Sequence, residues 1–152
     1  WQREIAQKLC DMGVDAIIGG HPHVIEPVDV FTSEDGTHKT FCAFSLGNQL
    51  SNQRREMMRL KTGNTEDGLF IDLEITRNKK GDVSLTGVKY IPTWVYKNAS
   101  GPTYSIVPVD DPSTVEEKTG IKGIQAQAQA SYDRTYKIIG DGVNKVSEAY
   151  GF

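Results

Sequence analysis

The stretch GVDAIIGGHPHV, residues 13–24, decides the fold, because an apolar run gives way within it to glycines and histidines. Residues 14–18 are short and apolar, which predicts a buried strand that two glycines then end. Ahead of it, residues 5–12 carry apolar side chains at helical spacing, and Gly13 is a typical helix stop. A helix, a tight turn, a buried strand and a glycine-rich exit form half of a βαβ-like unit.

Two of the three histidines of the chain, His21 and His23, flank Pro22 directly after this strand. The proline restricts His21 to extended backbone, and alternate residues of an extended segment point the same way. Both imidazole rings are therefore predicted to face one side, at the strand end where α/β sheets collect their ligands. Imidazole is a common ligand of Zn, Mn and Fe ions. Exposed histidines, or one hydrogen-bonded core histidine, are the alternative, and the spacing alone leaves both readings open.

A complete metal site needs more donors than this pair. A catalytic zinc site takes about three protein ligands, and a two-metal site takes more. At about 3.3 Å per residue, His38 lies tens of ångströms away, near the tip of a predicted hairpin. The sequence shows no Asp-x-His or Asn-His pair, so His21 and His23 are at best half of a site.

The hairpin brings a further polar side chain to the histidines. Two β-prone runs, residues 28–31 and 40–44, flank the turn-forming residues 33–36. A turn centred near Asp35 and Gly36 puts Asn48 opposite His23. The rest of the chain predicts these elements: a mobile loop or short helix at 49–65, a strand with one wet face at 69–75, a turn at 78–81, a long strand at 83–96 interrupted at Pro92, a turn at 98–102, a strand at 104–107, a short helix from Asp111 and a helix spanning 124–139.

Bulk composition excludes several classes of protein. The chain has 152 residues, 38% hydrophobic and 24% charged, which fits one globular domain. A net charge of −3 without a basic run gives no support for nucleic-acid binding. No stretch approaches the roughly 20 apolar residues that span a bilayer. Cys10 and Cys42 form no zinc pattern. The start at Trp1, directly before a helical pattern, suggests a piece of a longer protein.

Several segments together resemble the CapA family, the bacterial capsule and poly-γ-glutamate synthesis proteins. Residues 13–27 are followed at matching spacing by an aromatic strand at 41–44 and by Ser-Leu-Gly-Asn at 45–48, and residues 65–69 and 90–95 resemble the closing strands. The resemblance covers about residues 1–110. It implies an α+β fold of the α/β sandwich type, the carboxyl-terminal half of a calcineurin-like two-sheet sandwich flanked by helices. Residues 1–110 would form that part of the domain, and residues 111–152 a helical extension packing on it.

The resemblance also implies a metal centre. Gly20-His21-Pro22-His23 matches the last metal motif of calcineurin-like metallophosphoesterases, Gly-His-x-His. His21 and His23 would then be ligands of two divalent metal ions, Mn, Zn or Fe, each histidine facing a different ion. The other ligands would come from an amino-terminal half of the domain, so both ions are expected only in the complete domain.

Other residues are weaker candidates for substrate binding or for supporting a ligand. Asn48 could orient a ligand or bind substrate, or it could cap a turn. Glu26 could support a ligand, although a solvated surface position is favoured. Gly20, with Gly19, permits close approach of the backbone. Two further sets have favoured structural readings. Trp94 and Tyr96 are expected in the core rather than facing a polymer, and Arg54, Arg55, Arg59 and Lys61 are expected as solvated loop charges rather than a site for an anionic polymer.

Two functional hypotheses follow. In the first, the complete protein is a hydrolase in which water activated by two metal ions attacks a phosphoester or a related electrophile, and this chain alone is inactive. In the second, it is a non-catalytic binding or assembly module for export of capsule or poly-γ-glutamate. A self-standing β-rich interaction module is a third reading, which leaves the His-Pro-His motif unexplained. The resemblance implies a location at the outer face of the cell membrane, and exposed strand edges predict self-association.

Overall fold

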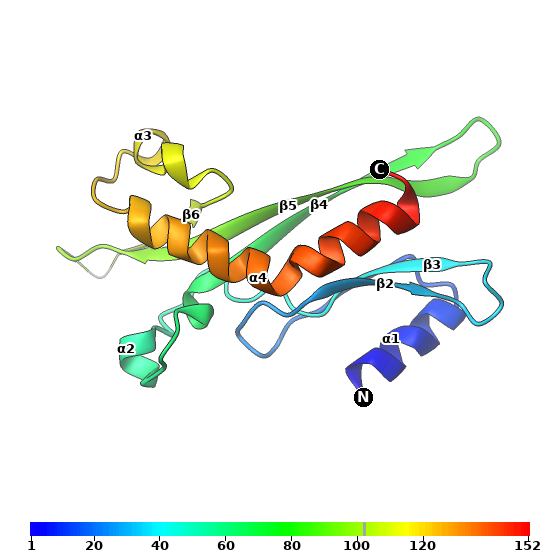
Figure 1. Ribbon diagram of the computed structural model, residues 1–152, viewed down its shortest axis with the longest axis horizontal. Coiled ribbons are helices and arrows are strands. Elements are labelled where there is room, and N and C mark those ends of the chain that lie inside the picture. Colours follow the sequence, from blue (N-terminus) through cyan, green and yellow to red (C-terminus); the bar gives the residue numbers. More distant parts are fainter. Residues whose placement is uncertain (102) are drawn as a thin grey trace.

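The computed structural model describes residues 1–101 and 103–152, and Figure 1 shows its course. Two three-stranded sheets are combined with helices at both ends of the chain, which confirms the α+β class. The turn expected at 98–102 includes Pro102, which lies outside the described residues.

The first sheet contains the predicted hairpin. Helix α1 (Gln2–Asp11) leads into the strands of this sheet, β1 (Ala16–Ile18), β2 (Val28–Thr32) and β3 (Lys39–Ala43), arranged in the order β1-β3-β2. β2 and β3 are antiparallel, with Val28 opposite Ala43, and a bridge between Ile25 and Leu46 continues the same register. This register confirms the alignment derived from the turn at residues 33–36.

The expectation that the first strand is buried is wrong. β1 runs parallel to β3 at the end of the sheet, with no other strand paired to it among the described residues. The side chain of Ile18 is 50% exposed, and Ala16 is exposed too. The apolar run at residues 14–18 therefore reflects a strand that has apolar side chains but only one neighbour.

The second sheet is an antiparallel meander of β4 (Asp67–Arg77), β5 (Val83–Lys97) and β6 (Tyr104–Pro108). The expected interruption of the long strand at Pro92 is wrong, because β5 is continuous through it. Pro92 lies opposite Leu69, whose carbonyl accepts a bond from Nε2 of Gln49 at 3.0 Å and so does not need the amide hydrogen that Pro92 lacks. The carbonyl of Pro92 accepts a bond from Val109 at 2.8 Å. The missing amide hydrogen of Pro92 therefore breaks no bond to β4.

Short helices and one long helix complete the chain: α2 (Arg55–Met58), the 3₁₀ turns η1 (Asn64–Glu66) and η2 (Pro112–Thr114), α3 (Val115–Thr119) and α4 (Gln125–Tyr150). The short helix expected from Asp111 is confirmed, and the Asp111 carboxylate accepts the amide of Ser113 as its cap. The helix predicted across residues 124–139 is also confirmed, although it extends to Tyr150.

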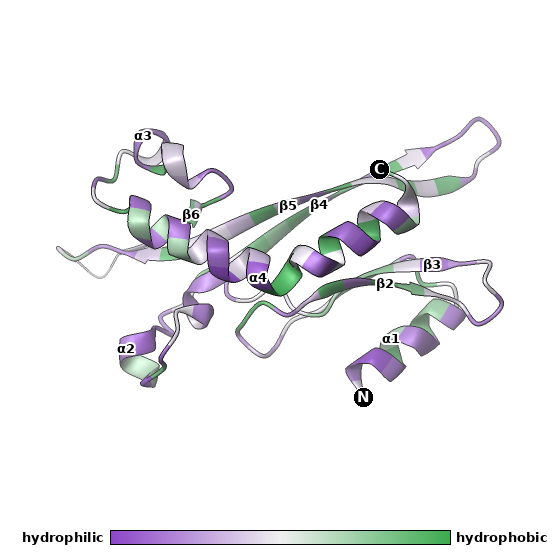
Figure 2. Ribbon diagram, viewed as in Figure 1, coloured by the Kyte–Doolittle hydropathy of each residue, from purple (hydrophilic) through white to green (hydrophobic). Residues whose placement is uncertain are grey.

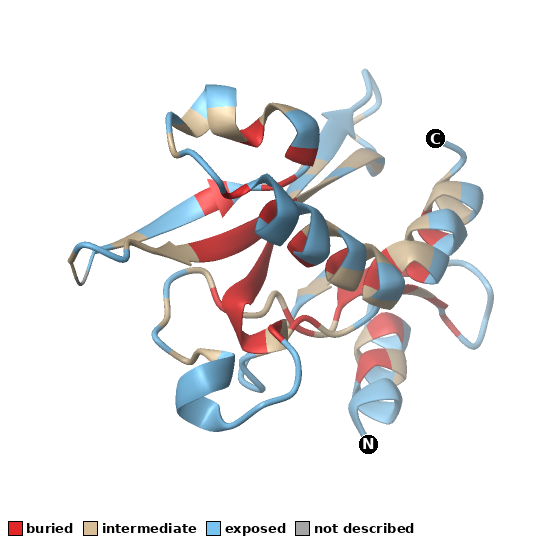
Figure 3. Cartoon of the chain, turned by 60° about the vertical axis from the view of Figure 1, so that its left-hand side comes forward, coloured by how far each residue is buried: buried red, intermediate tan, exposed pale blue. Residues whose placement is uncertain are grey.

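Helix α4 holds the two sheets together. It crosses β2 on one side and β5 on the other, with hydrophilic and hydrophobic residues on different faces (Figures 1 and 2). Phe41 and Val28 of the first sheet, Leu69 of the second and Ile139 of α4 share one buried cluster. Figure 3 shows the buried parts of these elements gathered where α4 meets the strands, while α2 is exposed. The core therefore lies between both sheets and this helix.

A second buried cluster lies under the other end of α4. Trp94 packs there with Val107 and Ala128, which confirms that this tryptophan belongs to the core, and Tyr96 packs against it. None of the described helices is both long and apolar enough to cross a membrane.

Candidate functional site: a histidine loop and its buried support

The loop with the two histidines is bent rather than extended. His21 has φ of 108° and His23 has φ of 61°, so the extended segment expected from Pro22 is wrong. The chain is anchored before the loop, where the Gly19 amide donates to the Ala43 carbonyl at 2.8 Å. It is anchored again just after the loop by the bridge of Ile25. The backbone must turn sharply between these anchors, and such strain at residues other than glycine is often found at functional sites.

The two glycines before the histidines have different roles. A Cβ atom on Gly19 would lie 2.1 Å from the carbonyl oxygen of Phe44, so only glycine fits against β3 there. A Cβ on Gly20 would meet nothing within 4 Å. The close backbone approach expected of the pair is therefore made by Gly19, and Gly20 lines an open groove beside His21.

Asn48 contacts His23, as the hairpin register predicts. The side-chain Oδ1 of Asn48 lies 2.8 Å from Nδ1 of the His23 ring. The Nδ2 of Asn48 donates to two carbonyls, that of His23 at 3.0 Å and that of Thr65 at 2.9 Å. Because both amide hydrogens are used, Oδ1 is the atom that faces the ring, and Nδ1 must carry the hydrogen. The Nε2 lone pair of His23 is then free to bind a ligand.

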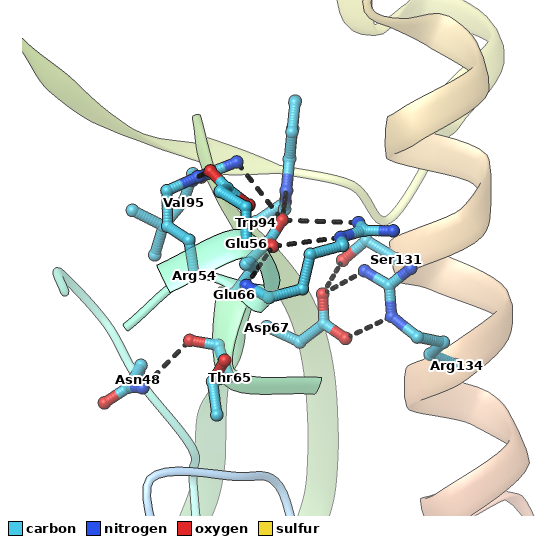
Figure 4. Close-up of polar contacts among 11 residues, drawn as sticks. Asn48, Arg54, Glu56, Thr65, Glu66, Asp67, Trp94, Val95, Ser131 and Arg134 are labelled. Carbon is cyan, nitrogen blue, oxygen red and sulfur yellow. Dashed lines mark hydrogen bonds and ion pairs between the residues drawn. The ribbon is translucent and has the colours of Figure 1, made fainter. Parts of the chain in front are cut away.

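Behind Asn48 lies a pair of buried carboxylates that the sequence reasoning missed. Glu66 accepts hydrogen bonds from Arg54 and Arg55, both at 3.2 Å, and from the Trp94 indole at 3.4 Å (Figure 4). Burial acts to raise the pKa of Glu66, but the bonds from Arg55 and the charge of Arg54 outweigh it, so the pKa lies below its usual value. Glu66 is thus held as a carboxylate inside the fold.

Asp67, the neighbouring carboxylate, faces helix α4. It accepts two bonds from the Arg134 guanidinium and one from the Ser131 hydroxyl, each at 2.7 Å (Figure 4). Burial raises the pKa of Asp67, and Arg134 and Ser131 oppose that rise. The adjacent acidic pair Glu-Asp, directly before an apolar strand and with arginines nearby, was the signal in the sequence. The partner Arg134 lies 67 positions away and could not be found from spacing.

The loop cations divide into two groups. The side chain of Arg54 is only 11% exposed and pairs with Glu66, so the expectation of a solvated charge is wrong for this residue. Arg55 pairs with the same carboxylate. Arg59 and Lys61 are exposed, as expected.

The remaining candidates are spread out. His21 is exposed, and Glu26 accepts a bond from Gln2 at 3.0 Å at the start of α1. His38 lies with its Nε2 3.1 Å from the Val14 carbonyl, at the turn end of the hairpin. Within residues 1–101 and 103–152, no group of three or more His, Cys, Asp or Glu side chains is placed to hold a metal ion. The structure therefore offers one prepared imidazole and a second one on the same loop.

An apolar groove of about 440 Å³ lies between α1 and the first sheet, and His21 stands at its margin. Its walls include Ile5, Leu9, Ile17 and Phe44. Cys42 lies in its floor, where burial raises the pKa of the thiol to about 12, so this cysteine is a poor metal ligand.

Comparisons with known proteins show which protein family this chain resembles. Residues 1–53 match the family described as bacterial capsule synthesis protein PGA_cap. The chain is also 30% identical over 87 residues to the PGA biosynthesis protein CapA of Bacillus subtilis strain 168, an alignment that covers 57% of this chain and 20% of that relative. These matches confirm the resemblance to the CapA family. No solved structure matches, so the calcineurin-like sandwich stays a prediction. The matched region contains every candidate site residue that the sequence predicts: Gly20, His21, His23, Glu26 and Asn48.

Proposed function

We propose that this chain, which is related to the CapA family of bacterial capsule synthesis proteins, contributes two metal ligands to a hydrolase of capsule or poly-γ-glutamate biosynthesis. The observation that carries the proposal is the 2.8 Å contact between Asn48 and Nδ1 of His23, which leaves Nε2 free. A histidine that binds a metal through one ring nitrogen usually donates a hydrogen bond from the N–H of its other ring nitrogen to an oxygen, as His23 does here to Asn48. His21 is the second ligand, on the same bent loop.

The donor set fits part of a metal centre. Neutral imidazoles suit Zn, Mn and Fe ions. A bound pair of such ions polarises a phosphoryl oxygen and lowers the pKa of water. His21 and His23 hold the ions and do not act as general bases. The other Asp, Asn and His ligands come from an amino-terminal half of the family domain, and this chain alone is therefore inactive.

A second candidate is a non-catalytic role in assembly or polymer export at the outer face of the cell membrane. Two observations favour it: the apolar groove beside α1 and the open edge of β1 are surfaces suited to packing against another polypeptide segment. The exposed cations Arg59 and Lys61 are available to an anionic polymer such as poly-γ-glutamate.

The two candidates are separated by removing the histidines from a full-length protein that contains this chain. His21→Ala with His23→Ala should abolish Mn²⁺-dependent hydrolysis of a phosphoester and stop polymer production. His38→Ala is the matched control, because His38 is at the turn end of the hairpin, and it should change neither readout. Normal polymer production by the double variant would contradict the hydrolase and favour the assembly role.

A further inference from the structure

We propose that Arg134 of helix α4 is a positioning residue for the His23 ring, acting through Asp67 and Asn48. The inference rests on the proposed role of His23 as a metal ligand, and it adds a residue from outside the region that matches the family. Three contacts in series connect the helix to the loop, from Arg134 to Asp67, from Asp67 to Asn48 and from Asn48 to His23, and each involves at least one buried residue.

The first contact fixes Asp67 to the helix. The Arg134 guanidinium donates two parallel hydrogen bonds of 2.7 Å to the Asp67 carboxylate, and the Ser131 hydroxyl, one turn earlier on α4, donates a third. A two-pronged bond of this kind fixes direction as well as distance. The residue Asp67 is 2% exposed, so water cannot replace these partners without opening the core.

The main chain of residues 65–67 then holds Asn48. The Asn48 amide donates to the Asp67 carbonyl at 3.1 Å, and its side chain donates to the Thr65 carbonyl at 2.9 Å. The segment around Asn48 and the start of β4 pack closely, because a Cβ atom on Gly68 would lie only 2.5 Å from the Asn48 carbonyl oxygen. A displacement of Asp67 must therefore move Asn48.

Asn48 in turn fixes the position of His23. Its Oδ1 accepts from Nδ1 of the ring, while its Nδ2 binds the His23 carbonyl, so the backbone and the ring of His23 are both fixed by one side chain. Asn48 is only 6% exposed and is bonded to the main chain of residues 65–67. The orientation of the His23 ring therefore depends on where these residues lie.

The fold should survive loss of Arg134, which makes the inference testable. Glu66 anchors the same segment independently, through Arg54, Arg55 and Trp94 on its other side. The variant Arg134→Gln removes the positive charge and the pair of parallel hydrogen bonds to Asp67 but leaves the contacts of Glu66 intact. Arg134→Lys keeps the charge and loses the pair of parallel hydrogen bonds.

The measurement is the tautomer of the neutral His23 ring, read from ring ¹⁵N shifts in the metal-free chain. We expect the Nδ1–H form in the unmodified chain, a shift toward a mixture with the Nε2–H form in Arg134→Gln, and a smaller shift in Arg134→Lys. Arg3→Gln is the matched control, because it breaks another pair with a buried carboxylate, Asp29, and should leave the tautomer unchanged. Mn²⁺ affinity at His23 should fall about 10- to 100-fold in Arg134→Gln.

The outcomes are distinct. A tautomer in Arg134→Gln equal to that of the unmodified chain would overturn the inference, and so would an equal change in the Arg3→Gln control. If the tautomer responds to Arg134 but Mn²⁺ binds nowhere near His23, the positioning role stands and the proposed metal function fails.

Discussion

At the scale of single residues, short-range chemistry was readable from the sequence and long-range pairing was not. The partner of His23 follows from one turn, because a hairpin register is set by the residues at its tip. The φ angles of His21 and His23 could not be read, because anchors on β3 and at Leu46 override the local preference before a proline. The Asp67–Arg134 pair depends on how α4 docks, which no local pattern encodes.

The Asp35 carboxylate in the hairpin turn gives a pH dependence. It accepts bonds from the hydroxyls of Ser33 and Thr37 at 2.6 and 2.8 Å, and these bonds lower its pKa from 3.8 to about 2. A carboxyl with a lowered folded pKa stabilises the fold above its unfolded pKa, and this contribution is lost as pH falls toward 2. Asp35→Asn should therefore lower the urea midpoint at pH 7, and the gap to the unmodified chain should close near pH 2.

Glu34→Gln is the control for this prediction. Glu34 lies in the same turn, and its carboxylate accepts no hydrogen bond within the part of the chain that the structure describes. The urea midpoints of Asp35→Asn and the unmodified chain should differ at pH 7 and converge near pH 2. A difference that is as large at pH 2 as at pH 7 would contradict the lowered pKa of Asp35.

At the scale of elements, periodicity predicted the type of most helices and strands but not their surroundings. The long helix was recognised because Gln and Ala favour helix and apolar residues recur every three or four positions. The exposure of β1 was missed, because an apolar run looks the same whether a strand has one neighbour or two. The continuity of β5 through Pro92 was missed too, because it depends on the Leu69 carbonyl being bonded to Gln49 instead.

The crossing of α4 over β2 can be tested with two glycines of the same helix. A Cβ on Gly142 would lie 1.8 Å from the Val28 carbonyl oxygen, whereas a Cβ on Gly140 would meet nothing within 4 Å. Gly142→Ala should lower the free energy of unfolding by about 1–3 kcal/mol, because backbone must move to admit the methyl group. Gly140→Ala should raise it by about 0.5–1 kcal/mol through helix propensity.

Chemical denaturation of both variants measures this difference. Equal effects of the two substitutions would show that α4 does not approach β2 as closely as described.

At the scale of the whole molecule, the sequence led to the fold class and to the resemblance to the CapA family, while the arrangement of the two sheets around α4 emerged only from the structure. Residues 13–27, followed by residues 45–48, carry the resemblance to the CapA family, and residues 1–53 match the family described as bacterial capsule synthesis protein PGA_cap. The buried support of the histidine loop draws on residues up to Arg134, far beyond that match. One site thus depends on packing across most of the chain.

Self-association is the prediction for the molecule as a whole. The open edge of β1 and the groove beside it leave Ile18 50% exposed and Ile5 39% exposed. We expect sedimentation that depends on protein concentration, because such edges and apolar surfaces pair between copies. Ile18→Lys should weaken the association, whereas Val83→Lys should not, because Val83 is 64% exposed but lies on β5, which is paired with β4. A monomer at all concentrations would contradict this account.

The central claim, that His21 and His23 are metal ligands, is tested most directly by titrating Mn²⁺ into this chain and following the ring signals of its three histidines by NMR. Paramagnetic broadening detects the weak binding expected of two imidazoles without further ligands. The account predicts that the rings of His21 and His23 broaden at Mn²⁺ concentrations that leave His38 sharp. Equal broadening of all three rings, or none at His21 and His23, would contradict it.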